Sequence, residues 1–400
     1  MDLKIFTDNI EGKALDQVYT LCKQEAFKDC KVRIMPDVHA GAGCVIGFTA
    51  DMGDKVIPNI VGVDIGCGML TVELGKIDID LEKLDEVIRL NVPVGHAIRT
   101  NSTGDMLVEG TLVPNLRCFK HLKDVERIYK SVGTLGGGNH FIEVDEGEDD
   151  KKYLVIHTGS RNLGKQVAEY YQKGAIDTML GKDDLVKEQE ELIQRLKAEG
   201  RAKDIQKELS KLKSTQRCKK LNIPSELCYL TGQNRLDYLH DMNICQEYAH
   251  VNRATIARAI LSKMGIKFID GFETVHNYIN FEDGICRKGA ISAQKGEKVL
   301  IPLNMRDGCI IGIGRGNEDW NCSAPHGAGR VMSRSVAKEN ISMEDYVDSM
   351  QGIYTTSVSQ STIDESPMAY KPMQEIIDNI KDTVDVQEII KPIYNFKAGE

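Results

Sequence analysis

An aspartate and a cysteine stand close together among glycines in the stretch Val61-Gly62-Val63-Asp64-Ile65-Gly66-Cys67-Gly68-Met69. A carboxylate and a thiolate together suit a borderline divalent metal ion, and a thiolate has enough lone pairs to bridge two ions. The alternative is structural: a buried cysteine beside an aspartate that caps a turn. These two residues alone favour the structural interpretation, so a metal site depends on partners elsewhere in the chain.

Three histidines supply such partners. His140, His157 and His276 each stand in or after a β-like run with small or polar residues nearby. Ligands from distant strand ends can converge on one metal centre, and five donors that include a bridging thiolate suit two ions. Two metal ions a few ångströms apart are a common arrangement for phosphoryl chemistry. We therefore interpret these histidines, with Asp64 and Cys67, as the metal-ligand set.

A further histidine, His326, lies in Ser323-Ala324-Pro325-His326-Gly327-Ala328-Gly329-Arg330, before a helix that the sequence predicts from about Val331. The small residues permit close approach of a ligand, and Arg330 and Arg334 supply positive charge for a phosphate. An imidazole that is not needed as a metal ligand can act as a nucleophile at phosphorus. Alternatively, His326 only binds phosphate and the metal ions activate water, as in a dimetal phosphohydrolase.

The elements that position these residues are short strands separated by glycine turns, followed by helices. Strands are predicted at 3–6, 31–35, 44–49, 56–63, 140–144, 153–156, 274–279, 298–303 and 309–313. Helices are predicted at 81–90, 116–132, 237–264 and 372–381, and residues 390–397 are expected to form a short tail. A glycine-rich loop between strands, residues 35–43, carries Asp37 and His39. Another, residues 133–139, matches neither a phosphate loop nor a dinucleotide fingerprint.

Residues 183–220 differ from the rest in being charged, with leucines such as Leu185, Leu192 and Leu196 at helical spacing. They predict a helical hairpin. From Lys182 to Lys220 there are twelve Lys and Arg against eight Asp and Glu. A solvated helical face explains this excess better than RNA contact does. Because the chain contains no linker, repeat or low-complexity tract, we predict one α+β domain over residues 1–400, with mixed β-sheets around a central metal site, flanking helices and the inserted hairpin.

Composition sets broad limits on function. The 400 residues are 41% hydrophobic, enough for a full core, and the net charge of −9 means that any nucleic-acid contact must come from a local basic surface. Eleven cysteines without a CxxC pair favour a reducing compartment over a disulfide framework. No signal or membrane-spanning segment is recognisable. We expect a cytoplasmic protein.

Six motifs together resemble those of the RtcB RNA-ligase family, in order and over nearly the whole chain. They are MPDVHAG, VGVDIGCGM, GGGNHFIEV, HTGSRNLG, the VHN around His276 and SAPHGAGR. The resemblance implies an RtcB-like fold and an enzyme that joins RNA 2′,3′-cyclic phosphate or 3′-phosphate ends to 5′-hydroxyl ends, in RNA repair or tRNA splicing. It also implies GTP and two Mn2+ ions per chain as cofactors, and RNA as partner. Our own expectation for the oligomeric state is a monomer.

The resemblance further implies roles for individual residues. Asp64, Cys67 and His140 would hold one Mn2+, Cys67, His157 and His276 would hold the other, and His326 would accept GMP. The implied GTP-binding residues are Asn139, His140, Glu143, His276, Asn277, Pro302, Asn304, Met305, His326, Gly327, Ala328, Gly329 and Lys397. Asp37, His39, Arg161 and Tyr370 are expected to support the site.

One stretch departs from the family pattern. Where the family has Ile-Pro-Gly-Ser-Met-Gly, this chain has Ile301-Pro302-Leu303-Asn304-Met305-Arg306. The departure is typical of a divergent branch, and Arg306 could bind a phosphate bidentately. A chain whose altered loop blocked the nucleotide would be a non-catalytic RNA-binding protein.

Overall fold

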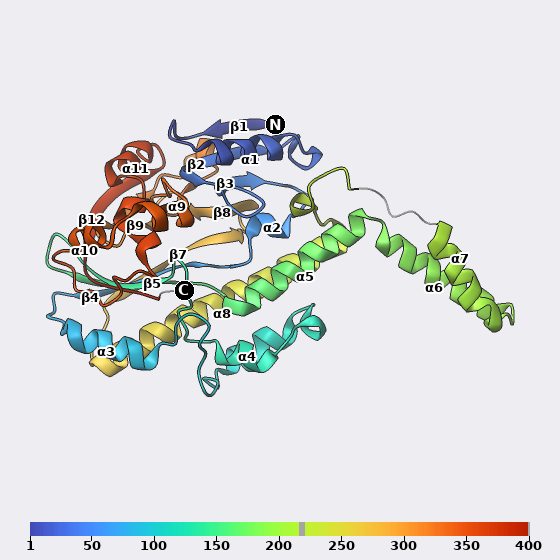
Figure 1. The fold of residues 1–400 in the computed structure, drawn as a ribbon, viewed down its shortest axis with the longest axis horizontal. Coiled ribbons are helices and arrows are strands. Elements are labelled where there is room, and N and C mark those ends of the chain that lie inside the picture. Colours follow the sequence, from blue (N-terminus) through green and yellow to red (C-terminus); the bar gives the residue numbers. More distant parts are fainter. Residues whose placement is uncertain (216–220, 399–400) are drawn as a thin grey trace.

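The computed structural model describes residues 1–215 and 221–398. Its body is a curved sheet with helices packed against it, and a pair of helices projects from that body (Figure 1). This architecture confirms the predicted α+β fold.

Twelve strands of the described residues form one mixed sheet. They are β1 (Asp2–Ile5), β2 (Lys31–His39), β3 (Ile46–Asp51), β4 (Gly68–Gly75), β5 (Phe141–Glu146), β6 (Lys152–Thr158), β7 (Asp270–Ile279), β8 (Ile285–Ser292), β9 (Lys298–Asn304), β10 (Gly308–Gly314), β11 (Ser323–Pro325) and β12 (Val384–Lys397). Their order is β1-β2-β3-β8-β7-β4-β6-β5-β12-β10-β9, with β11 on β8. All neighbours are antiparallel except the pair β1 and β2.

The strands from β7 to β9 in this order curl round a common interior. The last strand, β9, returns to β7, where the Leu300 amide donates to Thr274 Oγ1 at 3.1 Å. The long strand β12 makes the curl possible, because its first half pairs with β10 and its second half with β5. Side chains from strands distant in sequence therefore face one interior.

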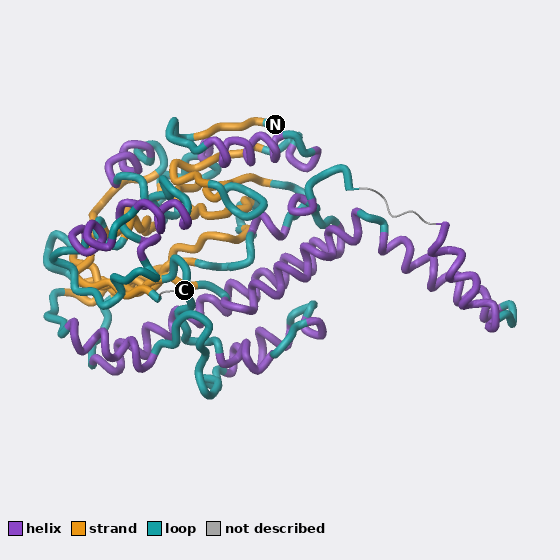
Figure 2. The backbone as a smooth tube through the Cα atoms, viewed as in Figure 1, coloured by secondary structure: helices purple, strands orange, loops and turns teal. Residues whose placement is uncertain are grey.

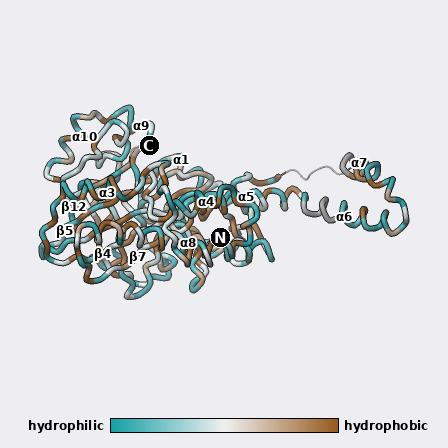
Figure 3. The backbone as a smooth tube through the Cα atoms, turned by 90° about the horizontal axis from the view of Figure 1, so that it is seen from below, coloured by the Kyte–Doolittle hydropathy of each residue, from teal (hydrophilic) through white to brown (hydrophobic). Residues whose placement is uncertain are grey.

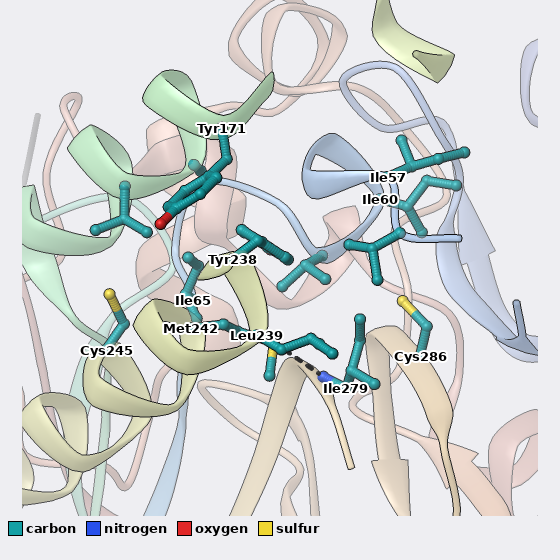
Figure 4. Packing of buried hydrophobic residues seen from close by; sticks show 14 of the residues in the cluster. Ile57, Ile60, Ile65, Tyr171, Tyr238, Leu239, Met242, Cys245, Ile279 and Cys286 are labelled. Atoms are coloured by element: carbon teal, nitrogen blue, oxygen red, sulfur yellow. Dashed lines mark hydrogen bonds between the residues drawn. The ribbon is translucent and has the colours of Figure 1, made fainter. Parts of the chain in front are cut away.

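Apart from the projecting pair, the helices pack around the strands (Figure 2). They are α1 (Gly12–Cys22), α2 (Pro58–Val61), α3 (Leu81–Asn91), α4 (Val125–Lys130), α5 (Arg161–Met179), α6 (Lys182–Ala198), α7 (Ile205–Thr215), α8 (Gly232–Met264), α9 (Arg334–Asn340), α10 (Met343–Ser349) and α11 (Met373–Asn379). The longest, α8, ends at Gly265, which adopts the left-handed conformation (φ +69°) that favours glycine. Its residues Tyr238, Met242 and Cys245 are completely buried and pack with α2 and α5 in the largest core (Figure 4).

The predicted strand at 56–63 is wrong. Pro58 begins the short helix α2, where a proline at the first helical position is preorganised, and Gly62 ends it with φ +97°. Ile57 and Ile60 are fully buried in the core of Figure 4. A short helix that is buried on every side has the same apolar composition as a buried strand. The sequence pattern therefore does not distinguish the two.

Four further predictions need correction. The helix expected at 116–132 is reduced to short turns and α4, because the buried Asp241 carboxylate accepts the amides of Arg117 and Cys118 and holds the chain in a loop. The helix expected from Val331 begins at Arg334, after the capping Ser333. The predicted tail belongs to β12. The loop expected around Asp37 and His39 is part of β2, which continues through both residues.

The helical hairpin predicted at 183–220 is present as α6 and α7, with residues 216–220 outside the described part of the chain. It projects away from the body in two perpendicular views (Figures 1 and 3). Leu196 is buried and Leu192 and Leu209 are half-buried, whereas the side chain of Leu185 lies outside the described residues. The ten cysteines of the described residues are free. No helix among the described residues has the length and apolarity to cross a membrane.

Candidate metal and nucleotide site

The predicted metal-ligand residues converge from separate elements. His140 precedes β5, His157 lies in β6, His276 lies in β7, and Cys67 precedes β4. Cys67 Sγ lies 3.5 Å from His140 Nε2 and 3.3 Å from His157 Nε2, and His157 Nε2 lies 3.2 Å from His276 Nε2. His140 Nε2 also lies 3.0 Å from Asp64 Oδ2. These five residues thus form a chain of contacts with Cys67 in the middle.

The hydrogen bonds of His140 and His157 leave each of them a nitrogen lone pair that can bind a cation. His140 Nδ1 lies 2.8 Å from the Leu135 carbonyl and His157 Nδ1 lies 3.1 Å from the Asn139 carbonyl, so each Nδ1 donates and each Nε2 keeps a lone pair. Two such lone pairs face the Cys67 sulfur, an arrangement that a divalent ion between them stabilises.

Burial also shifts the pKa values of His157, His276 and Cys67. Burial and neighbouring histidines hold the pKa of His157 and His276 well below the ordinary value, so both imidazoles are neutral ligands. Burial and the Asp64 carboxylate raise the pKa of Cys67, so a thiolate there requires a cation beside it. Cys67, His140 and His157 are grouped closely enough to share one ion.

Two backbone features hold Asp64 in this position. Gly159 leaves the space that Asp64 occupies, because a Cβ there would lie 2.2 Å from Asp64 Oδ1. Asn277 adopts φ +77° and donates its Nδ2 to the Asp64 carbonyl at 3.3 Å. Burial alone would raise the pKa of Asp64, but His140 and Arg161 beside it lower that pKa to about 2, so the carboxylate is ionised.

His326 stands next to this cluster, after β11, with its ring centroid 4.6 Å from that of His276. Its Nδ1 lies 2.6 Å from Asp37 Oδ2, and the same oxygen accepts the His326 amide at 3.1 Å. Asp37 is completely buried. The carboxylate therefore fixes the Nδ1–H tautomer and leaves the lone pair of Nε2 available.

A cavity of about 470 Å³ opens beside His326. Most of the predicted nucleotide-binding residues line it: Asn139, Glu143, Pro302, Asn304, Met305, His326, Gly327, Ala328, Gly329 and Lys397. His157, His39 and Tyr370 also line it. Of the remaining predicted site residues, Asp64, Cys67, His140, His276 and Asn277 belong to the histidine cluster and its support, and Asp37 lies behind His326. Arg161 approaches His140 Nδ1 at 3.4 Å.

Glu365, a buried acidic residue that the sequence did not predict as part of a site, organises one wall of this cavity. Glu365 pairs with Lys397, with Arg334 at 2.7 Å and with Arg330 at 3.4 Å, and it accepts the Tyr370 hydroxyl at 2.6 Å. Burial opposes ionisation, but these cations lower the pKa of Glu365 to about 2. The two arginines thus line the cavity with part of their charge already balanced. Nothing in the Thr362-Ile363-Asp364-Glu365 stretch marks it as part of a site.

The stretch that departs from the family pattern lies partly in the core. Leu303 and Met305 are buried, and Met305 accepts a hydrogen bond from Tyr346. Arg306 is exposed and pairs with the adjacent Asp307 at 2.8 Å. It is absent from the residues that line the cavity, so the arrangement does not favour a phosphate-binding role for it.

Comparisons with known proteins agree with this geometry. A family model described as "tRNA-splicing ligase RtcB" matches residues 18–114 and 116–398. The chain is 29% identical to "RNA-splicing ligase RtcB" of Escherichia coli strain K12, over 97% of this chain and 95% of that protein. It is also 29% identical to "tRNA-splicing ligase RtcB" of Archaeoglobus fulgidus, over 92% of this chain and 87% of that protein.

Proposed function

The chain belongs to the RtcB family of RNA ligases, and we propose that it joins an RNA 2′,3′-cyclic phosphate or 3′-phosphate end to a 5′-hydroxyl end, using GTP and Mn2+ and forming a guanylated His326. The observation that carries the proposal is the contact between His326 Nδ1 and the buried Asp37 at 2.6 Å. It gives a cavity-lining imidazole an Nε2 with a free lone pair, which is what attack on phosphorus requires. We also propose that residues 1–400 act as one ligase domain and as a monomer.

The histidine cluster is proposed to hold two Mn2+ ions. Asp64, Cys67 and His140 would hold one, and Cys67, His157 and His276 would hold the other. Bound there, the ions supply neutralisation of phosphate charge and polarisation of the phosphorus centre. The neutral state of His157 and His276 supports this assignment, because a charged imidazole cannot bind a metal.

Two further residues that line the cavity are proposed to bind the guanine. Lys397 and Glu143 both line the cavity and both are buried. Burial raises the pKa of Glu143 to about 7, although Asn395 and Lys397 act against it. Glu143 can therefore either accept or donate a hydrogen bond near neutral pH, depending on its proton, which suits recognition of a base edge.

His326 then carries the group transfer. Its Nε2 forms a bond to the α-phosphorus of GTP, and the bond to pyrophosphate breaks. An oxygen of the RNA 3′-phosphate next displaces the imidazole, so GMP moves to the RNA end. The 5′-hydroxyl finally attacks the activated 3′-phosphorus, loses its proton and releases GMP. A 2′,3′-cyclic end must first be opened by water to a 3′-phosphate.

Incubation with α-labelled GTP and Mn2+, followed by a denaturing gel, tests the proposal. We expect the label on the wild-type chain and none on His326→Ala, which should retain its metal ions. A phosphoramidate is labile in acid and stable in base, so the stability of the adduct identifies the bond. Label on His326→Ala, or an adduct that maps to a lysine, would contradict the proposal.

The same assay separates the rival functions. A dimetal phosphohydrolase would release phosphate from RNA ends without GTP. A non-catalytic RNA-binding protein would neither release phosphate nor accept the label. Ligation of matched RNA ends, with and without GTP, provides the direct readout.

A further inference from the structure

A second group of potential ligands lies inside the curled sheet. Glu143 and Asp145 alternate along β5 and share one face of it, and Cys309 lies on β10, joined to β5 through β12. One ligand atom from each lies within 4.8 Å of the other two. Asp145 and Cys309 are completely buried and Glu143 is 3% exposed. The group shares no residue with the Cys67 and histidine cluster.

The carboxylate of Asp145 is poorly satisfied. Within the described residues its oxygens have no well-aligned hydrogen-bond partner, although the Cys309 thiol lies close enough to lower the pKa of Asp145 somewhat against the effect of burial. Asn395, also completely buried, donates its Nδ2 to Glu143, while its own Oδ1 has no partner in the same part of the structure. Buried polar groups without partners cost free energy and are rare in folded proteins. Several unpartnered oxygens beside one thiol therefore indicate a missing ligand.

The charges point to the kind of ligand. Burial, followed by the charge of Glu143, raises the pKa of Asp145 far above its usual range. Burial and both carboxylates likewise raise the pKa of Cys309. Lys397, the cation that acts on Glu143, is itself paired with Glu365. Buried acidic groups in such surroundings are stabilised either by a shared proton or by a metal ion.

The distances favour an ion. Cys309 Sγ lies 4.0 Å from Glu143 Oε2. A zinc ion binds sulfur at about 2.3 Å and a carboxylate oxygen at about 2.1 Å, so both atoms can reach one ion without rearrangement of the strands. Mixed sulfur and oxygen donors suit zinc better than the harder ions Mg2+ and Ca2+.

We propose that Glu143, Asp145 and Cys309 bind a Zn2+ ion. This site is separate from the proposed Mn2+ centre. The bound ion would take the place of the Glu143 proton and keep Glu143 as a hydrogen-bond acceptor in the wall of the nucleotide cavity, which it also lines. Zinc binding does not depend on the proposed ligase activity, because it can be measured without GTP or RNA.

The first test is zinc content after metal removal, reloading with Zn2+ and dialysis. Asp145→Asn keeps the size of the side chain and removes its charge, so we expect one equivalent of zinc fewer than in the wild type. Asp378→Asn, an exposed aspartate far from the site in sequence, is the matched control and should keep the wild-type content. An unchanged zinc content in a folded Asp145→Asn chain would overturn the proposal and indicate a shared proton.

The second test identifies the thiolate and does not depend on Asp145. The Cys67→Ala chain, loaded with Co2+, should still show a thiolate-to-cobalt charge-transfer absorption. Adding Cys309→Ser should abolish that absorption, while the melting curve shows whether the double variant is folded. Absence of the absorption in Cys67→Ala alone would show that Cys309 binds no metal and would contradict the proposed site, whatever the outcome of the guanylation assay.

Discussion

Asp37 is the residue on which the reactivity of His326 depends in the proposed mechanism. Its Oδ2 accepts both the Nδ1–H and the amide of His326, although the two residues are 289 positions apart in the chain. A charged acceptor holds the tautomer and stabilises the positive charge that develops on the imidazole during attack.

We therefore expect Asp37→Asn to slow guanylation by about 10- to 1,000-fold, because the amide accepts the hydrogen bond but lacks the charge. The rate of adduct formation measures this, and metal content should stay at the wild-type level. Asp378→Asn is the control for loss of an exposed carboxylate. A guanylation rate equal to that of the wild type would show that Asp37 does not assist the histidine.

At this scale the sequence was informative about residue types and less so about contacts. His140, His157 and His276 were predicted as one set because each follows a recognisable pattern, and the structure brings their rings together. Glu365 was missed because a lone glutamate in a polar stretch carries no local signal. Its importance arises from Lys397, Arg330 and Arg334, which reach it from other elements.

At the scale of elements, the stretch from Leu303 to Arg306 combines a structural change with a surface change. Leu303 is 3% exposed and belongs to a hydrophobic cluster with Ile301 and Ala328. Arg306 forms only an exposed ion pair with its neighbour, and such pairs contribute about 0–1 kcal/mol. Of the three replacements that restore the family pattern, those at Leu303 and Arg306 should therefore have different effects.

We expect Leu303→Gly to lower the free energy of unfolding by about 3–5 kcal/mol, because it removes a buried side chain and loosens a strand. Arg306→Gly should change stability by less than about 1 kcal/mol and leave GTP affinity unchanged. Urea unfolding and nucleotide titration measure the two quantities. A large loss of GTP affinity in Arg306→Gly would restore the phosphate-binding role that its exposed position does not favour.

The ion cluster around Glu365 connects the short turn Ile363–Glu365 to the end of β12 and to α9. We expect Glu365→Gln to lower the free energy of unfolding by about 3–5 kcal/mol near neutral pH, because it leaves Lys397 buried without its carboxylate partner and removes one of the two carboxylates that pair with Arg334.

The pH dependence of this difference follows from the lowered pKa. Ionised Glu365 contributes its stability above its unfolded pKa of about 4.5, and this contribution is lost as pH falls through the folded value of about 2. The difference between wild type and Glu365→Gln should therefore be constant above pH 5 and shrink below it. Chemical denaturation across this range measures it, and a difference that persists undiminished at low pH would contradict the assignment.

At the scale of the whole molecule, the fold class and the hairpin could be predicted, whereas the order of the strands could not. Hydrophobic periodicity shows that residues 298–303 and 390–397 are apolar, but it contains no information on which strands pair. The continuous β12, which joins β10 to β5, was taken for a tail because Pro392 interrupts its pattern. The register shift between Pro392 and Tyr394 accommodates that proline, which lacks a donor for the strand ladder.

The position of the hairpin leads to the last prediction. Helices α6 and α7 pack on each other through Leu196 and its half-buried neighbours, and they extend away from the body that contains the cavity (Figure 3). Replacing residues 182–220 by a flexible Gly-Ser linker should therefore change the guanylation rate less than about two-fold, because no residue of the cavity is removed.

The excess of basic residues in this hairpin makes RNA contact the alternative to a solvated helical face. RNA affinity measured as a function of salt concentration distinguishes the two. If the basic residues of the hairpin neutralise phosphates, the deletion will weaken RNA binding and flatten its salt dependence. We expect the slope to be unchanged, since α6 carries acidic as well as basic residues and the ion pair of Lys211 with Glu208 in α7 already balances part of the charge. A deletion that guanylates normally but loses RNA affinity and salt dependence together would instead identify the hairpin as an RNA-binding arm.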